Sequence, residues 1–161
     1  MKAAPTQGRR AHGLRIAILR ALFNPQVTDG LLQGALRELA ELGADARRLH
    51  VFDVPGAFEL PLAAQAAARS RRFDAIVALG AVIRGETDHY EHIAREAAAG
   101  LAAVARETGV PVGFGVLTVR RVAHALARSR RAGDNKGREA ARAAVLTVHA
   151  LRALRERGRR S

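Results

Sequence analysis

The chain has 161 residues, a formal net charge of +12 and no cysteine. This length is enough for one domain with its own apolar core, and the lack of cysteine excludes disulfides and thiolate metal sites. No apolar run is long enough for a signal peptide or a membrane span, so we expect a cytoplasmic protein without membrane contact.

The excess of positive charge comes from arginine, since the only lysines are Lys2 and Lys136. A basic chain could bind nucleic acid, but the arginines are spread over several predicted helices without a nucleic-acid-binding motif. Only one Tyr and five Phe are available to stack on bases. We therefore expect no nucleic-acid partner, and the charge favours attraction of a small anionic substrate.

Short β-like runs alternate with amphipathic helical runs from residue 14 onward. Apolar runs predict strands at residues 14–20, 47–54, 74–79 and 110–118. Apolar side chains at helical spacing predict helices at residues 25–42, 58–70, 88–108, 121–129 and 137–157.

Several of these helices carry recognisable ends in the sequence. Asn24 and Pro25 suit an N-cap and a first helical position, because proline lacks only an amide that would be unpaired there. Asp88 and Glu91 have the spacing of a capping box at the start of the third helix, and Gly109 is expected to end it.

Strands that alternate with helices predict an α/β fold, a three-layer α/β/α sandwich around a four-stranded parallel sheet of the doubly wound, flavodoxin-like type. We expect residues 1–13 to form a flexible or docking arm, residues 14–158 a single domain and residues 159–161 a tail. Ligands of such folds bind beyond the carboxyl ends of the strands. The segments that follow the strands should therefore hold the site.

Aromatic side chains follow the first two predicted strands. Phe23 could stack on a planar heterocycle or cap the core, and the sequence leaves both open. The run PGAFE (55–59) precedes a helix, where unpaired amides can hold polar ligand groups. Glu59 could accept hydrogen bonds from ligand hydroxyls or simply lie against the positive helix end.

His89 is the most informative single residue. It lies in the first turn of the long third helix, where the macrodipole disfavours a cation, so we expect a neutral imidazole ready to accept a proton. A solvated helix-start histidine is the alternative. The amides of residues 85–87 and the Thr87 hydroxyl could hold a phosphate, with Arg128 as a countercharge. These residues predict a phosphate-binding enzyme with a histidine base.

A metal site is the other interpretation of this segment, because His92 lies three residues beyond His89 and carboxylates are near. No third ligand is obvious, and the two imidazoles should point along different lines of the helix. We expect no metal.

Five short motifs make the sequence specific: FN after the first strand, VPGAFELP after the second, LGAVIRGETDHY after the third, GVPVGFGVLT at the fourth, and AGDNKGREAA opening the last helix. Their order and spacing are similar to those of 6,7-dimethyl-8-ribityllumazine synthases, the riboflavin synthase β-chain family. The resemblance extends from about Leu14 to Leu154. It implies a transferase that condenses 5-amino-6-(D-ribitylamino)uracil with 3,4-dihydroxy-2-butanone 4-phosphate, the penultimate step of riboflavin biosynthesis, and that needs no cofactor.

The resemblance also implies roles for single residues. Phe23 would stack on the pyrimidine, and His89 would transfer protons. Arg128 would contact the phosphate from a neighbouring subunit. The other implied substrate-binding positions are Ala57, Phe58 and Glu59 on the pyrimidine and ribityl side, Ala81, Val82 and Ile83 along the ring, Glu86 and Thr87 at the phosphate, Phe114 from the neighbouring subunit, and Lys136 as added positive charge.

The implied assembly is a homopentamer, or a larger shell of pentamers, with one site at each interface and riboflavin synthase as a possible partner. Three alternatives stay open: a riboflavin synthase that shares the fold, a non-catalytic flavin-binding or cage-forming relative, and a basic RNA-binding module. The chain also departs from the family pattern. Leu22 stands where many relatives have arginine, and Ala81 replaces a common threonine. Asp88, beside His89, could favour the protonated imidazole or merely cap the helix.

Overall fold

The computed structural model describes residues 10–160. These residues form strands alternating with helices along the whole chain. The elements are β1 (Ile16–Ala21), α1 (Pro25–Glu41), the 3₁₀ turn η1 (Ala46–Arg48), β2 (Leu49–Val54), the 3₁₀ turn η2 (Ala57–Glu59), α2 (Leu60–Arg69), β3 (Ala75–Ile83), α3 (His89–Thr108), β4 (Val112–Val119), α4 (Val122–Ala127) and α5 (Lys136–Arg159).

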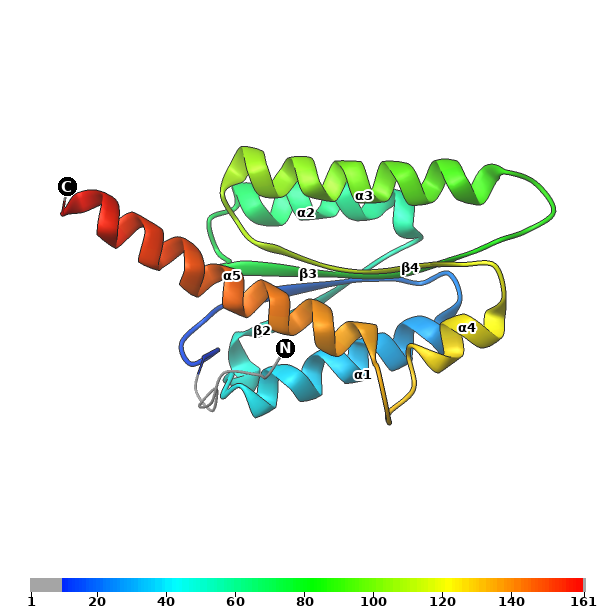
Figure 1. The fold of residues 1–161 in the computed structure, drawn as a ribbon, viewed down its shortest axis with the longest axis horizontal. Helices are drawn as coiled ribbons and strands as arrows, with labels where there is room; N and C mark the ends of the chain where they lie inside the picture. The colour runs from blue at the N-terminus through cyan, green and yellow to red at the C-terminus, as the bar shows by residue number, and fades with distance from the viewer. Residues whose placement is uncertain (1–9, 161) are drawn as a thin grey trace.

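The four strands form one parallel sheet in the order β2-β1-β3-β4. Helices α2 and α3 cover one face, and α1, α4 and α5 cover the other (Figure 1). The predicted three-layer, doubly wound α/β sandwich is therefore confirmed. From β1 the chain winds first to β2 on one side and then to β3 on the other, so the topological switch point lies between β1 and β3.

The core divides into two apolar layers, one on each face of the sheet. Alternate side chains of a strand point to opposite faces: Ile16 and Ile18 pack toward α1 and α5, whereas Ala17 and Leu19 pack toward α2 and α3. Strands β1 and β3 are buried almost throughout, as expected for parallel strands covered on both faces. The buried alanines of α5 allow that helix to lie close to the sheet.

The third strand is longer than the sequence predicts. It continues through Gly80–Ile83, a stretch that we expected to form a loop, because Gly80–Ile83 pairs with Val116–Val119 of β4. The segment that connects β3 to α3 is correspondingly short. The second strand begins later than expected, at Leu49, since Asp45 caps a 3₁₀ turn by accepting a hydrogen bond from the Arg47 amide at 2.9 Å.

Asn24 and Asp88 occupy the N-cap positions of α1 and α3 as predicted, and Pro25 opens α1, but neither side chain caps its helix. Asn24 precedes α1 but adopts a left-handed conformation (φ 59°), and its Nδ2 donates to the Ala81 carbonyl at 3.1 Å instead of capping the helix. The Asp88 side chain makes no cap at α3. The side-chain oxygen that accepts a hydrogen bond at this helix start belongs to Thr87, whose Oγ1 accepts from the His89 amide at 3.4 Å. Gly109 ends α3 as expected, at φ 73°.

Residues 1–9 and 161 lie outside the described part of the chain, so most of the expected arm and the last residue of the expected tail are not described here. The division into arm, domain and tail stays a prediction. Within residues 10–160 no helix is long and apolar enough to cross a membrane.

Candidate active site

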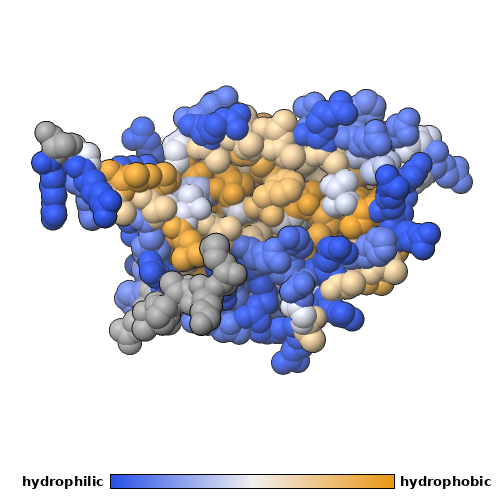
Figure 2. Space-filling view, viewed as in Figure 1, coloured by the Kyte–Doolittle hydropathy of each residue, from blue (hydrophilic) through white to orange (hydrophobic). Residues whose placement is uncertain are grey.

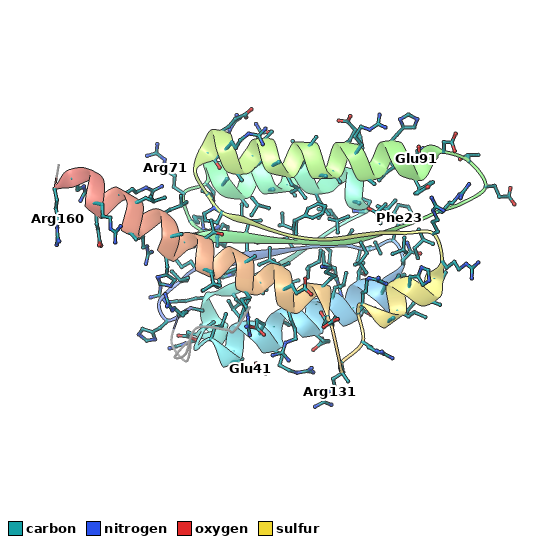
Figure 3. All side chains as sticks on the ribbon, viewed as in Figure 1. Phe23, Glu41, Arg71, Glu91, Arg131 and Arg160 are labelled. Carbon is teal, nitrogen blue, oxygen red and sulfur yellow. The ribbon has the colours of Figure 1, made fainter. Side chains whose placement is uncertain are left out.

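An open cavity of about 470 Å³ lies at the carboxyl ends of β1 and β3, at the topological switch point. Figure 3 shows Phe23 at this end of the sheet, close to the start of α3, where Glu91 is labelled. The lining residues come from the segments that follow β1 and β2, the end of β3 and the start of α3. They are Phe23, Asn24, Gly56, Ala57, Phe58, Glu59, Ala81, Val82, Ile83, Gly85, Thr87, His89, Tyr90 and Ile93.

Phe23 presents its ring to the cavity and does not cap the core, because 68% of the residue is exposed. Its backbone amide donates to the Pro55 carbonyl at 3.1 Å, which ties the segment after β1 to the segment after β2. The ring lies directly over Gly56, where an added Cβ would be only 2.7 Å from Phe23 Cδ2. Glycine at position 56 therefore allows the ring to lie across this turn.

Glu59 uses one carboxylate oxygen within its own turn, since Oε2 accepts a hydrogen bond from the Gly56 amide at 3.0 Å. This bond stabilises the helix start, which is one of the two roles that the sequence suggests for Glu59. The second oxygen, Oε1, remains the one that a ligand hydroxyl could meet. The two roles expected for Glu59 are thus compatible.

The end of β3 offers backbone groups to the cavity because β3 is longer than β1 in this direction. The pairing of β1 with β3 ends at Arg20 and Leu79, whereas β3 continues to Ile83. Beyond Leu79, one edge of β3 has no neighbouring strand, so its amides and carbonyls can bond to something else. The Ala81 carbonyl accepts from Asn24, and the rest of this edge borders the cavity.

His89 is the first residue of α3, is exposed, and lines the same cavity as Phe23. Gly85 and Thr87 line it as well, next to the amides at the helix start. Glu86 and His92 do not line it. No group of three or more His, Cys, Asp or Glu side chains with the geometry for a metal ion occurs in residues 10–160.

Arg128 and Lys136 border a second cavity of about 380 Å³ at the carboxyl end of β4, together with Arg120 and His124. The Arg128 guanidinium donates to the His124 carbonyl at 3.1 Å, and Lys136 Nζ pairs with Glu139 at 2.6 Å. Within one chain, these cations are separate from the cavity that holds His89. Phe114 is 48% exposed on the edge strand β4 and lines neither cavity.

Sequence reasoning missed several of these residues. Asn24 and Gly56 lie inside the motifs FN and VPGAFELP, in which only the neighbouring residues were assigned a role in the site. His124 stands four residues before Arg128, a spacing that places both on one side of a helical segment and could have identified it, whereas Arg120 precedes α4 in a bend and carried no such signal.

A larger groove of about 780 Å³ lies between α1 and α4 and holds none of the predicted site residues. Its polar lining consists of arginine, glutamine and serine, and Figure 3 marks Arg131 near its edge. None of these groups can act as an acid or base near neutral pH. The cavity with His89 is therefore the better candidate for an active site.

The family model described as 6,7-dimethyl-8-ribityllumazine synthase matches residues 13–152. The chain is 52% identical to 6,7-dimethyl-8-ribityllumazine synthase 1 of Caulobacter vibrioides, over 88% of this chain and 93% of that protein. It is 44% identical to the 6,7-dimethyl-8-ribityllumazine synthase of Syntrophus aciditrophicus, over 91% of this chain and 96% of that protein. It is also 44% identical to the protein of the same name from Nitratidesulfovibrio vulgaris, over 89% of this chain and 92% of that protein.

Proposed function

The chain belongs to the 6,7-dimethyl-8-ribityllumazine synthase family, and from this premise we propose how its residues carry out the reaction. The protein is a transferase that condenses 5-amino-6-(D-ribitylamino)uracil with 3,4-dihydroxy-2-butanone 4-phosphate, the penultimate step of riboflavin biosynthesis. The observation that best supports the site is that one cavity holds the Phe23 ring, the unpaired edge of β3 and His89.

The pyrimidine occupies the part of this cavity formed by β1, β2 and β3. A planar ring stacks on the exposed face of Phe23, and its polar edge pairs with backbone groups of Ala81–Ile83. The ribityl hydroxyls meet the turn at Ala57–Glu59, where Glu59 Oε1 accepts a hydrogen bond. This assignment uses an exposed aromatic ring, the edge of β3 that has no neighbouring strand, and the second carboxylate oxygen of Glu59.

The butanone phosphate binds at the start of α3, where Glu86 and Thr87 precede the first helical residue and the helix dipole favours an anion. The Thr87 hydroxyl adds a donor. Arg128 and Lys136 approach the phosphate from a neighbouring subunit, because within one chain they border a different cavity.

The chemistry requires little more than orientation and proton transfer. The amine of the pyrimidine substrate attacks the ketone and water leaves, phosphate then departs, and the ring closes with loss of a second water. Fixing both reactants in one site replaces a bimolecular encounter, which is worth about 7–11 kcal/mol in well-oriented cases. His89 moves the protons between these steps.

We propose that the assembly is a homopentamer or a shell of pentamers. Figure 2 shows a band of apolar residues between α3 and α5, where Figure 1 places the edge strand β4. Exposed apolar surface framed by polar side chains is typical of an interface, and Phe114 lies on this strand. Light scattering and negative-stain imaging distinguish a pentamer from a shell, and co-elution tests riboflavin synthase as a partner.

Incubation with both substrates tests the function directly. We expect the lumazine chromophore to appear together with an equal amount of phosphate. Riboflavin formed from lumazine without the butanone phosphate would identify a riboflavin synthase instead, and tight binding without any product would identify a non-catalytic relative. RNA retained at low salt and lost at high salt would indicate a nucleic-acid-binding module.

Two variants test the site. His89→Ala should slow turnover by about 100-fold or less, the low end of the range for general acid–base groups, because orientation contributes most. A loss of about 10⁶-fold, as for a removed nucleophile, would contradict this role. Arg128→Ala should raise KM for the butanone phosphate far more than KM for the pyrimidine, and equal effects would contradict its assignment to the phosphate.

A further inference from the structure

Asn135 is one of few polar residues buried in the part of the chain that the structure describes, with 2% of its surface exposed, and its side chain is fully hydrogen-bonded. It stands immediately before α5. Its Oδ1 accepts from the Gly137 amide at 2.8 Å and from the Arg138 amide at 3.2 Å. Its Nδ2 donates to the carbonyls of Gly30, Ser129 and Arg130 at 3.0–3.1 Å, so two amide hydrogens are shared among three acceptors.

These bonds connect three parts of the chain at one point: the start of α5, the turn after α4, and the middle of α1. The packing is close, because an added Cβ at Gly34 of α1 would collide with Asn135 Oδ1. The turn that is held in this way begins at Arg128 and ends at Lys136, and the Lys136 amide donates to the Arg128 carbonyl at 2.8 Å. Arg128 and Lys136, two of the cations that border the second cavity, are therefore attached to the segment that Asn135 holds.

Capping of α5 does not explain why this residue is asparagine. Serine, threonine or aspartate can cap a helix with a side-chain oxygen about as well. A serine or threonine hydroxyl has a single donor and aspartate has none, whereas the asparagine amide accepts through one atom and donates two hydrogens through another, so it can bond to carbonyls of two segments at once. The donors are directed at α1 and at the turn that follows Arg128, so the amide serves to fix the turn as well as to cap the helix.

We propose that Asn135 is a positioning residue for the phosphate subsite. It touches no substrate, and it acts by holding the main chain of Arg128 and Lys136 at the orientation from which they reach the phosphate in the neighbouring subunit's site. The inference rests on the proposed function, because it assigns a purpose to Asn135 only if Arg128 contacts the phosphate. A shift of about 1 Å in such a group can reduce activity about 100-fold.

Asn135→Ser is the main test, since serine keeps a capping oxygen and removes the amide donors. We expect KM for the butanone phosphate to rise by about tenfold or more while KM for the pyrimidine stays within about twofold. Gly34→Ala should give the same selective pattern from the α1 side, and it keeps the test valid if Asn135→Ser does not fold. Val145→Ala, buried ten residues further along α5, is the matched control for lost packing and should leave the ratio of the two KM values unchanged.

Addition of Asn135→Ser to the Arg128→Ala/Lys136→Ala double variant separates positioning from a general structural role. If Asn135 acts through these two cations, the added change should alter KM for the phosphate substrate by less than about twofold. Equal rises in both KM values in Asn135→Ser, or a further selective rise in the triple variant, would overturn the inference while the proposed function stands. An Arg128→Ala variant with no selective effect would overturn the phosphate assignment and this inference together.

Discussion

The interaction between α1 and α5 gives a quantitative prediction, because it depends on a buried carboxylate. Glu38 has a side chain that is 1% exposed, and it accepts hydrogen bonds from Arg138 Nε at 2.9 Å and Arg142 Nε at 2.6 Å. The arginine side chains are 29% and 42% exposed, and Arg138 also pairs with Glu41. Burial lowers the pKa of Arg138, but the hydrogen bonds and charges of Glu38 and Glu41 together outweigh it, so that this pKa is raised. The network is therefore asymmetric, because the Glu38 carboxylate is shielded from water whereas the two guanidinium groups are partly exposed to it.

Removal of the two sides should have different costs. In Glu38→Gln both guanidinium groups can turn toward water, so we expect a loss of about 1–2 kcal/mol, the difference between charged and neutral hydrogen bonds. In Arg138→Met/Arg142→Met the carboxylate stays buried without a donor, which costs about 3–5 kcal/mol.

Urea unfolding followed by circular dichroism at pH 7 measures both values. The protein concentration must be held constant, because association of subunits changes the apparent stability. If Glu38→Gln cost as much as the double arginine variant, burial of the carboxylate would not be the factor that decides the energy of this network.

Other predictions concern single contacts. Gly56→Ala should push the Phe23 ring aside and raise KM for the pyrimidine, with little change in melting temperature because the ring is exposed. Asn24→Ala loses the bond to the Ala81 carbonyl and places alanine at positive φ, so urea unfolding should register a loss of about 2 kcal/mol. Gly109→Ala, at φ 73°, should cost about 1 kcal/mol in the same assay, and no loss would mean that the end of α3 rearranges.

The sequence was sufficient to predict the α/β sandwich. The spacing of apolar residues alternates along the chain between strand-like and helix-like segments, and both patterns can be recognised locally. The sequence was not sufficient for features that depend on distant partners. Strand β3 extends to Ile83 because Val116–Val119 of β4 pairs with it. The N-cap position of Asn24 could be predicted, but the bond of its side chain could not, because the carbonyl that it meets lies 57 residues away.

The candidate site divides in the same way. Residues that follow β1, β2 and β3 converge because parallel strands end at one edge of a sheet, and this could be predicted from their order alone. Within one chain Arg128 and His89 line different cavities, so only the family resemblance assigns them to a common site. Leu22 is 45% exposed beside the cavity, and nothing in the structure explains why it replaces arginine.

The overhang of β3 beyond β1 has a consequence for attempts to redesign the enzyme. In this segment the side chains of Ala81 and Val82 point into the two opposite core layers, while the main-chain edge borders the cavity. A mutant library at these positions would therefore select mainly for folding, and substrate preference would change little. Under the proposed assignment, the contribution of β3 to binding depends on where β1 stops, because this sets how many main-chain groups of β3 have no neighbouring strand. Preference would otherwise change through the side chains that line the cavity from other segments, such as Phe23, Glu59 and Thr87.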